Sequence, residues 1–232
     1  MIGKITKIET MGSADGPGVR LVLFMAGCKL RCIYCHNPET WCLSGKEQNI
    51  TPEEVLKIYK KYNIYYGDKG GVTFSGGEPL LQTEFVLETI KLLKQNNIHT
   101  AIDTSGVADN YDEILKLVDL VILDVKSIDE NEYKHITGHN MDNFNMFVDK
   151  CKSLNKKLWL RQVIVPNLND DEEHILRLKQ FTSTLNNVER IELLPYHTMG
   201  VYKYNELGLE YELAGVQDMD KERCKQLEIL LK

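Results

Sequence analysis

Short, almost wholly apolar runs alternate with amphipathic stretches along the chain. Six runs have the length and composition of buried strands, at residues 20–27, 71–78, 99–106, 119–126, 157–165 and 190–197. Apolar residues recur at helical spacing in the stretches 51–63, 83–97, 111–118, 143–156, 170–185 and 220–232. Uninterrupted apolar strands that alternate with helices indicate a parallel sheet that helices cover. The pattern predicts an α/β fold, a partial (β/α)6 TIM-like barrel with parallel strands and helices on the outside.

No linker, repeat or low-complexity segment interrupts this pattern, so we expect residues 1–232 to form a single domain. Hydrophobic residues make up 43% of the chain and charged residues 27%, which is ordinary for a globular protein. The net charge of −6 argues against nucleic acid as a partner. No apolar run has the ~20 residues of a membrane span, and the N-terminal segment lacks the apolar core of a signal peptide. We therefore expect a cytoplasmic protein that binds neither nucleic acid nor a membrane.

Polar residues gather at the predicted carboxyl ends of the strands, where parallel β/α folds carry their chemistry. A cysteine-rich loop, GCKLRCIYCHN at 27–37, follows the first strand. The other strands carry Ser75-Gly76-Gly77-Glu78, Asp103-Thr104, Asp124-Val125-Lys126, Arg161 and His197. A purely structural role does not explain why so many polar groups should converge on one rim.

The loop contains Cys28, Cys32 and Cys35 in the spacing C-x3-C-x2-C. A structural zinc site usually draws its ligands from two separated pairs, so three thiols in one loop are an unusual zinc arrangement. A cubane iron–sulfur cluster has four irons, and three thiolates leave one iron open to a ligand from outside. A structural zinc, and a four-cysteine cluster that recruits Cys42, are alternatives that the spacing leaves open.

This spacing, with the aromatic Tyr34 before the last cysteine, resembles the signature of the radical S-adenosylmethionine superfamily. The segment 75–79, SGGEP, resembles the glycine-rich strand end of that superfamily, which contacts the methionine amino group. The resemblance implies one 4Fe-4S cluster ligated by Cys28, Cys32 and Cys35, with S-adenosylmethionine bound at the open iron. These three cysteines are then both the metal ligands and the catalytic residues.

Several further segments resemble one family within it, the pyruvate formate-lyase activating enzymes. They are DGPGVR (15–20), YCHNPETW (34–41), GGVTFSGGEPLLQ (70–82), DTSG (103–106), LDVK (123–126) and IELLPYHTMG (191–200). Activases of related glycyl-radical enzymes carry a cysteine-rich insert after the first loop, and none stands between Cys42 and Thr51 here. The resemblance implies that a 5′-deoxyadenosyl radical removes a hydrogen from a glycine in a loop of pyruvate formate-lyase. It also implies an external one-electron donor such as flavodoxin or ferredoxin, and we expect a monomer.

The resemblance further implies a set of cofactor-binding residues at the strand ends. The set is Tyr34, Cys35, His36, Asn37, Gly77, Glu78, Asp103, Asp124, Val125, Lys126, Arg161 and His197. Within it, Tyr34 and His36 are expected to flank the adenine, and the backbone of Gly77 to meet the methionine moiety. The segment 124–126 is expected to line the ribose and carboxylate, and His197 to contact the adenosyl group.

Asp103 and Asp124 end neighbouring strands close to where the cofactor carboxylate is expected. Several negative groups in a partly buried site require a counterion. We hypothesise that Lys126 supplies it, together with a monovalent cation bound by Asp103 and Asp124. Lys126 and Arg161 could instead be ordinary surface charges, although both lie in strands that are otherwise apolar.

Two segments are expected to touch the glycine loop of the partner, DGPGVR at 15–20 and HTMGVYKYNELG at 197–208. Two alternative functions remain at this stage. One is activation of a different glycyl-radical enzyme. The other is an iron–sulfur electron carrier without radical chemistry, which predicts that S-adenosylmethionine does not perturb the cluster.

Overall fold

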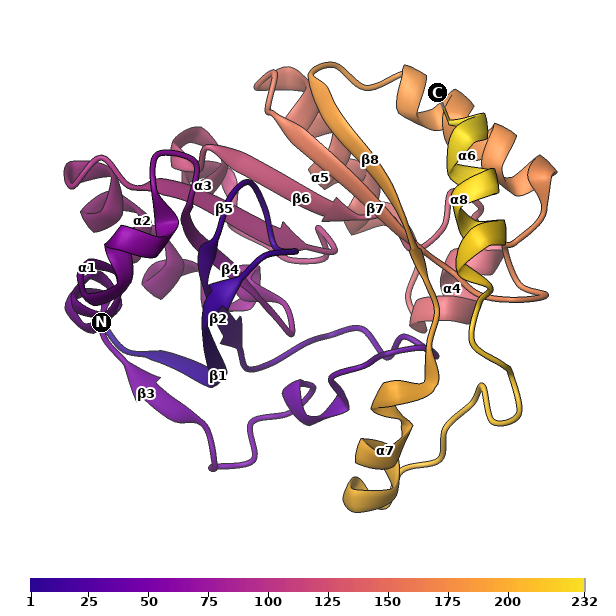
Figure 1. Ribbon diagram of the computed structural model, residues 1–232, viewed down its shortest axis with the longest axis horizontal. Helices are drawn as coiled ribbons and strands as arrows, with labels where there is room; N and C mark the ends of the chain where they lie inside the picture. Colours follow the sequence, from indigo (N-terminus) through magenta and orange to yellow (C-terminus); the bar gives the residue numbers. More distant parts are fainter. Residues whose placement is uncertain (232) are drawn as a thin grey trace.

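A computed structural model describes residues 1–231 and contains one eight-stranded sheet, in the order β3-β1-β2-β4-β5-β6-β7-β8. Strands β2, β4, β5, β6, β7 and β8 pair in parallel, as the sequence predicts. β1 pairs antiparallel with both β2 and β3. The sheet curves from β3 at one edge to β8 at the other without closing, so the barrel is partial (Figure 1).

The six predicted strands are confirmed as β2 (Arg20–Met25), β4 (Gly71–Gly76), β5 (His99–Thr104), β6 (Leu120–Asp124), β7 (Leu158–Ile164) and β8 (Val188–Pro195). The apolar pattern did not predict the antiparallel strands β1 (Gly3–Gly12) and β3 (Gln48–Ile50). In β1 the register shifts between Ile5 and Lys7 and again between Glu9 and Gly12. Such irregularities break the two-residue alternation by which a half-buried strand is recognised.

The predicted helices are confirmed as α1 (Pro52–Tyr66), α2 (Thr83–Gln95), α3 (Asp112–Leu117), α5 (Asp142–Ser153), α6 (Glu172–Ser183) and α8 (Lys221–Leu230). The last was predicted to reach residue 232, which lies outside the described residues. The sequence did not predict α4 (Glu130–Thr137) and α7 (Val201–Leu207), nor the short turns η1 (Pro38–Thr40), η2 (Pro79–Gln82) and η3 (Thr198–Gly200).

Helices α1 to α6 and α8 follow the outer side of the sheet, and α7 lies at the rim beyond the end of β8 (Figure 1). Among the described helices, none combines the length and apolar character needed to cross a bilayer. Helix α1 begins with a capping box, in which Thr51 Oγ1 accepts from Glu54 N and Glu54 Oε2 accepts from Thr51 N. These reciprocal hydrogen bonds fix where the helix begins.

The inner face of the sheet changes character along the strands. Ala101, Leu120, Ile122 and Trp159 form a small buried apolar cluster of their own. Two residues further along each of the three strands stand Asp103, Asp124 and Arg161. Because residues two apart in a strand share a face, the charged groups lie on this same face, nearer the carboxyl rim. An apolar floor thus leads to a charged rim.

Candidate active site

A cavity of about 240 Å³ lies between the cysteine loop and the carboxyl ends of β4, β5 and β6. Most of the predicted site residues line it, namely Cys28, Cys32, Tyr34, Cys35, His36, Asn37, Gly77, Asp103, Asp124 and Lys126. Glu78, Val125, Arg161 and His197 are not part of its lining. The structure therefore brings together residues that lie up to about a hundred positions apart in the sequence.

A wider groove of about 850 Å³ shares Cys28 and Trp41 with this cavity. Much of its remaining lining is apolar, including Leu43, Leu81 and Phe85. Size alone would favour the groove, but acids, a buried lysine and three thiols converge on the smaller cavity. Convergent polar and titratable groups are the better mark of a functional site. The smaller cavity is therefore the candidate active site.

The three cysteines of the loop are free thiols that burial keeps protonated. Burial raises the pKa of Cys28 and of Cys32 to about 12, and it raises the pKa of Cys35 as well. Thiols of this kind are poor nucleophiles at neutral pH, whereas a metal displaces the proton and binds the thiolate. The loop suits metal ligation better than covalent catalysis.

The geometry bears on one of the two alternatives for the cysteines, the four-cysteine cluster that recruits Cys42. Within residues 1–231, no three His, Cys, Asp or Glu side chains stand close enough to hold a single metal ion. Cys42 is exposed and does not line the cavity, and its Sγ lies 3.7 Å from Arg31 Nη2. A fourth cysteine ligand from Cys42 therefore has no support in the geometry.

Strand β4 ends in two glycines that pack directly against the start of the cysteine loop. Gly76 has a φ of +106°, and a Cβ there would lie 2.4 Å from Met25 N. A Cβ on Gly77 would lie 2.3 Å from the carbonyl oxygen of Gly27. Only glycine permits this approach, so the pair joins the β4 end to the loop and leaves its main chain open on the cavity.

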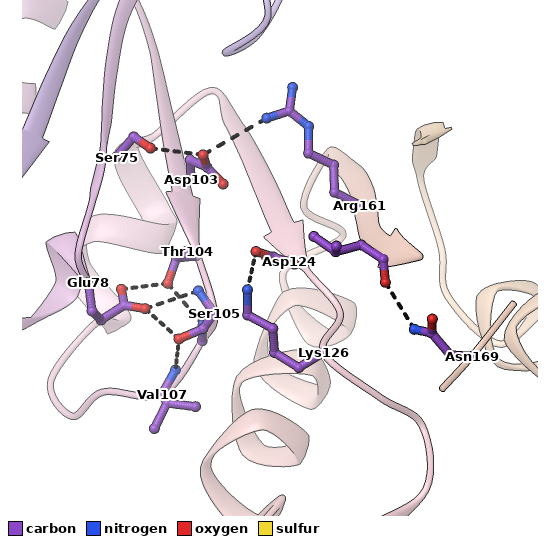
Figure 2. A network of polar contacts seen from close by, with 12 residues as sticks. Ser75, Glu78, Asp103, Thr104, Ser105, Val107, Asp124, Lys126, Arg161 and Asn169 are labelled. Carbon is purple, nitrogen blue, oxygen red and sulfur yellow. Dashed lines mark hydrogen bonds and ion pairs between the residues drawn. The ribbon is translucent and has the colours of Figure 1, made fainter. Parts of the chain in front are cut away.

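Glu78 was predicted to bind the cofactor, but its carboxylate is engaged within the protein. It is 1% exposed and accepts hydrogen bonds from Thr104 Oγ1 (2.6 Å), Ser105 N (3.0 Å), Ser105 Oγ (2.6 Å) and Leu80 N (3.1 Å). Burial raises the pKa of this carboxyl, although its four donors oppose the shift. Figure 2 shows Glu78 directed at the end of β5, so the side chain ties the β4 end to the β5 end.

Asp103 stands at the end of β5 between a hydroxyl and a guanidinium. Ser75 Oγ donates to its Oδ2 (2.9 Å), and Arg161 Nη1 lies 3.9 Å from the same oxygen (Figure 2). Burial raises the pKa of Asp103 to about 6, and Arg161 opposes that shift. Arg161 also donates from Nε to Glu192 Oε2 (2.9 Å) and from Nη2 to the carbonyl of Ala14. Arg161 thus contacts Asp103, Glu192 and Ala14, and its part in cofactor binding stays a prediction.

The predicted ion pair between Lys126 and Asp124 is present at the end of β6 (Figure 2). Burial by itself lowers the pKa of Lys126, but Asp124, Cys32 and Tyr34 together raise it well above its usual value. The Lys126 ammonium also lies 5.5 Å from the centre of the Tyr34 ring. Asp124 Oδ1 is buried without a hydrogen-bond partner in residues 1–231, so one acceptor is left for a bound molecule. The monovalent cation stays a prediction.

Tyr34 and His36 line the cavity from the loop, whereas His197 stacks behind His36. The two imidazole centroids are 3.9 Å apart at 19°, and His36 Nε2 donates to the carbonyl of His197 (2.8 Å). Burial lowers the pKa of His36, and the neighbouring His197 adds to that shift. Val125 is 1% exposed and its amide donates to the carbonyl of Arg161 (2.7 Å), so its predicted part in cofactor binding stays a prediction.

Sequence reasoning missed several residues of the cavity wall, namely Leu30, Thr40, Trp41, Ser105, Val163 and Leu194. Ser105 follows Thr104 at a strand end, so its position was a usable signal. Val163 and Leu194 are apolar residues within strands β7 and β8, and nothing in the pattern separates an apolar residue that faces a cavity from one that faces the core.

The sequence profile of the Radical SAM superfamily matches residues 22–178, which include the cysteine loop and the ends of β4, β5 and β6. The chain is 49% identical over 234 residues to the pyruvate formate-lyase-activating enzyme of Clostridium pasteurianum, covering 100% of this chain and 98% of that protein. It is 41% identical to the protein of that name from Staphylococcus epidermidis, covering 97% of this chain and 93% of that protein. A solved domain of the pyruvate-formate lyase-activating enzyme from Bacteroides vulgatus matches 70% of this chain and 92% of its own, with a TM-score of 0.57 and 26% identity.

Proposed function

This chain belongs to the radical S-adenosylmethionine superfamily and, within it, to the pyruvate formate-lyase-activating enzymes, and from this membership we infer that it activates pyruvate formate-lyase. With a 4Fe-4S cluster and S-adenosylmethionine bound, such an enzyme makes a 5′-deoxyadenosyl radical that takes a hydrogen from a glycine of the partner and leaves a glycyl radical. The chain itself supplies ligands, orientation and exclusion of water. We propose that residues 1–232 act together as one domain, since a single sheet runs from β1 to β8.

One observation carries the proposal at the level of the site. Three free thiols and the Gly76-Gly77 strand end meet at one cavity, in contact through Gly27. The donor set fits a cluster with three protein ligands, because three thiols of one loop line a shared space. Cys28, Cys32 and Cys35 are the proposed ligands, each of which must lose its proton when the cluster binds.

The remaining wall fits a zwitterionic nucleoside cofactor. Gly77 offers main chain to the methionine part, and the ammonium of Lys126 is the natural partner of a carboxylate. Asp124 Oδ1, buried and unpaired in the described residues, suits a ribose hydroxyl. Tyr34 and His36 present aromatic faces for the adenine, with His197 bracing His36 from behind.

The partner contacts are proposals of the same kind. The glycine of pyruvate formate-lyase must come within van der Waals reach of the radical, so a loop of the partner has to enter over the rim. The proposed contacts are the segments 15–20 and 197–208. An external one-electron donor such as flavodoxin or ferredoxin reduces the cluster, and the enzyme acts as a monomer in the cytoplasm, where its six free cysteines stay reduced.

The test is an anaerobic reaction of the cluster-loaded, reduced enzyme with S-adenosylmethionine and pyruvate formate-lyase. The expected result is a glycyl-radical doublet in the electron paramagnetic resonance spectrum together with 5′-deoxyadenosine. Formation of 5′-deoxyadenosine without a doublet would point to a different glycyl-radical enzyme as the partner. An intact cluster that gives neither product would favour the electron carrier.

A further inference from the structure

A segment far along the chain packs against the second half of the cysteine loop. His36 Nε2 donates to the carbonyl of His197 (2.8 Å), and Tyr204 Oη donates to the carbonyl of Cys35 (3.0 Å). Gly200 lies so near the loop that an added Cβ would be 3.0 Å from His36 Cα. Residues 197–204 therefore brace the loop at its third cysteine and just beyond it.

Lys203 gives this brace its only ammonium group. Its Nζ lies 2.9 Å from His36 O, 3.0 Å from Asn37 Oδ1 and 2.6 Å from Glu39 Oε1. An ammonium has three hydrogens, so these three acceptors use all of them. The Lys203 side chain is 22% exposed, which leaves little of it for a partner protein. The Lys203 ammonium therefore binds the cysteine loop and has little surface left for a partner protein.

The ammonium also fixes which atom of the Asn37 amide is engaged and which is left free to donate. Lysine only donates, so the amide atom against it has to be the acceptor Oδ1. The amide nitrogen Nδ2, with two hydrogens, has no hydrogen-bond acceptor among residues 1–231. Asn37 is among the residues that line the cavity, so its amide nitrogen is available as a donor for a molecule bound there.

We propose that Lys203 is a positioning residue that sets the polarity of Asn37, so that Asn37 Nδ2 donates to an acceptor of bound S-adenosylmethionine. This inference rests on the proposed function, because that function supplies the ligand. The cofactor offers adenine nitrogens and a carboxylate as acceptors. Without the ammonium the amide can turn over, and a donor that must first be oriented binds more weakly than one already held in place.

A simpler role for Lys203 would be to hold the loop without regard to Asn37. A double-mutant cycle separates the two roles, because residues that act through one contact give non-additive effects. The variants are Lys203→Met, Asn37→Ala and the two combined, each loaded with the cluster. The measurement is the dissociation constant of S-adenosylmethionine by calorimetry, with KM and kcat for glycyl-radical formation beside it.

Each single variant is expected to weaken binding about tenfold, the scale of one hydrogen bond to a charged or oriented partner. The combined variant is also expected to lose about tenfold. The KM for S-adenosylmethionine should rise by a similar factor, while kcat should stay within about threefold of the parent value. An additive loss of about a hundredfold, or unchanged affinity in Lys203→Met, would overturn the assignment.

Three further variants guard against misfolding and general charge effects. Asn37→Asp keeps an acceptor for the ammonium but has no donor, so it should bind about tenfold more weakly although the brace stays intact; parent-like affinity would overturn the proposal. Glu39→Gln keeps the contact between Lys203 and Asn37, so its dissociation constant for S-adenosylmethionine should stay within about threefold of the parent value. Lys225→Met removes an exposed lysine of α8 whose partner is Glu222, and it should bind like the parent. If the parent itself binds no S-adenosylmethionine, the proposed function fails, whatever the cycle shows.

Discussion

The two halves of the cysteine loop are held in different ways. Residues 27–33 are held mainly by main-chain hydrogen bonds to other segments, and the side chains of Arg31 and His139 add hydrogen bonds to carbonyls of this half. The main-chain hydrogen bonds are Gly27 N to Thr40 O (2.7 Å), Cys28 N to Trp41 O (3.1 Å), Arg31 N to Thr137 O (3.0 Å) and Ile33 N to Ile136 O (2.9 Å). Residues 34–39 make local main-chain hydrogen bonds, such as Cys35 N to Cys32 O (2.9 Å), but they are tied to the distant part of the chain by side chains from residues 197–204, above all Lys203 and Tyr204.

The difference matters because a main-chain hydrogen bond does not depend on the identity of the side chain. The main-chain part of the first half's support should therefore tolerate most substitutions at the residues whose carbonyls accept these hydrogen bonds. The second half depends on two particular side chains that stand 167 and 169 positions away from the carbonyls they bind. His36 and Asn37, which line the cavity, lie in the half that a single distant substitution can disturb.

The largest expected effect comes from loss of a cluster ligand. The proposed ligands stand in both halves of the loop, so a change in either half should remove the cluster. Cys32→Ser and Cys35→Ser should each abolish the four-iron absorbance and the glycyl radical, because a hydroxyl is a poor ligand for iron in such a cluster. Iron and sulfide content with electron paramagnetic resonance would measure this. Cys42→Ser is the matched control and should keep the parent values. A cluster lost from Cys42→Ser would restore the four-cysteine alternative.

At the end of β5, Asp103 is likewise held by side chains, those of Ser75 and Arg161. Its buried carboxyl should make the stability of the fold depend on pH. Its pKa is raised from 3.8 to about 6, chiefly by burial, so the folded chain holds this proton more tightly than the unfolded chain does. The stability from protonated Asp103 is full below about pH 4 and is lost as the pH rises to about 6. The loss amounts to about 2 to 3 kcal/mol of unfolding free energy.

Urea unfolding of the cluster-free chain between pH 4 and 7 would measure this loss. Asp103→Asn should remove the corresponding fall, so the unfolding free energies of parent and variant should diverge across this range in favour of the variant at pH 7. Parallel curves would mean that Ser75 and Arg161 already compensate the buried carboxylate. In that case ionisation of the buried Asp103 would not lower the unfolding free energy.

The sequence predicted what depends on local pattern. Strands such as β6 are buried on both faces, so they read as continuous apolar runs, and polar residues at their ends mark the rim. Strand β1 escaped because its register shifts break the alternation. The contact of Arg161 with Asp103 depends on how β5, β6 and β7 are aligned, where Asp124 pairs with Arg161. That register, like the reach of Lys203 across 167 positions, is set by tertiary packing and leaves no local signal.

The smallest expected effect comes from a pair of variants that compares the supports of the two halves directly. Tyr204→Phe removes the hydroxyl that donates to Cys35 O and should lower the unfolding free energy by about 1 kcal/mol. Hydrogen exchange should quicken at the amides of residues 34–40 and stay unchanged at 27–33. Lys29→Met is the matched change in the first half. It removes an ion pair with Asp109 whose side chains are 43% and 69% exposed, so the change should stay within about 0.5 kcal/mol.

The exchange pattern decides whether the comparison holds. Protection lost only after Cys35 in Tyr204→Phe would mean that the two halves open separately, as their different supports imply. Loss of protection across all of residues 27–40 would mean that the loop opens as one unit. The main-chain bonds at Gly27 and Cys28 end on Thr40 and Trp41, so they tie the start of the loop to its end and offer a route for that coupling. A uniform response would therefore show that the brace from residues 197–204 supports the whole loop, the three proposed ligands included.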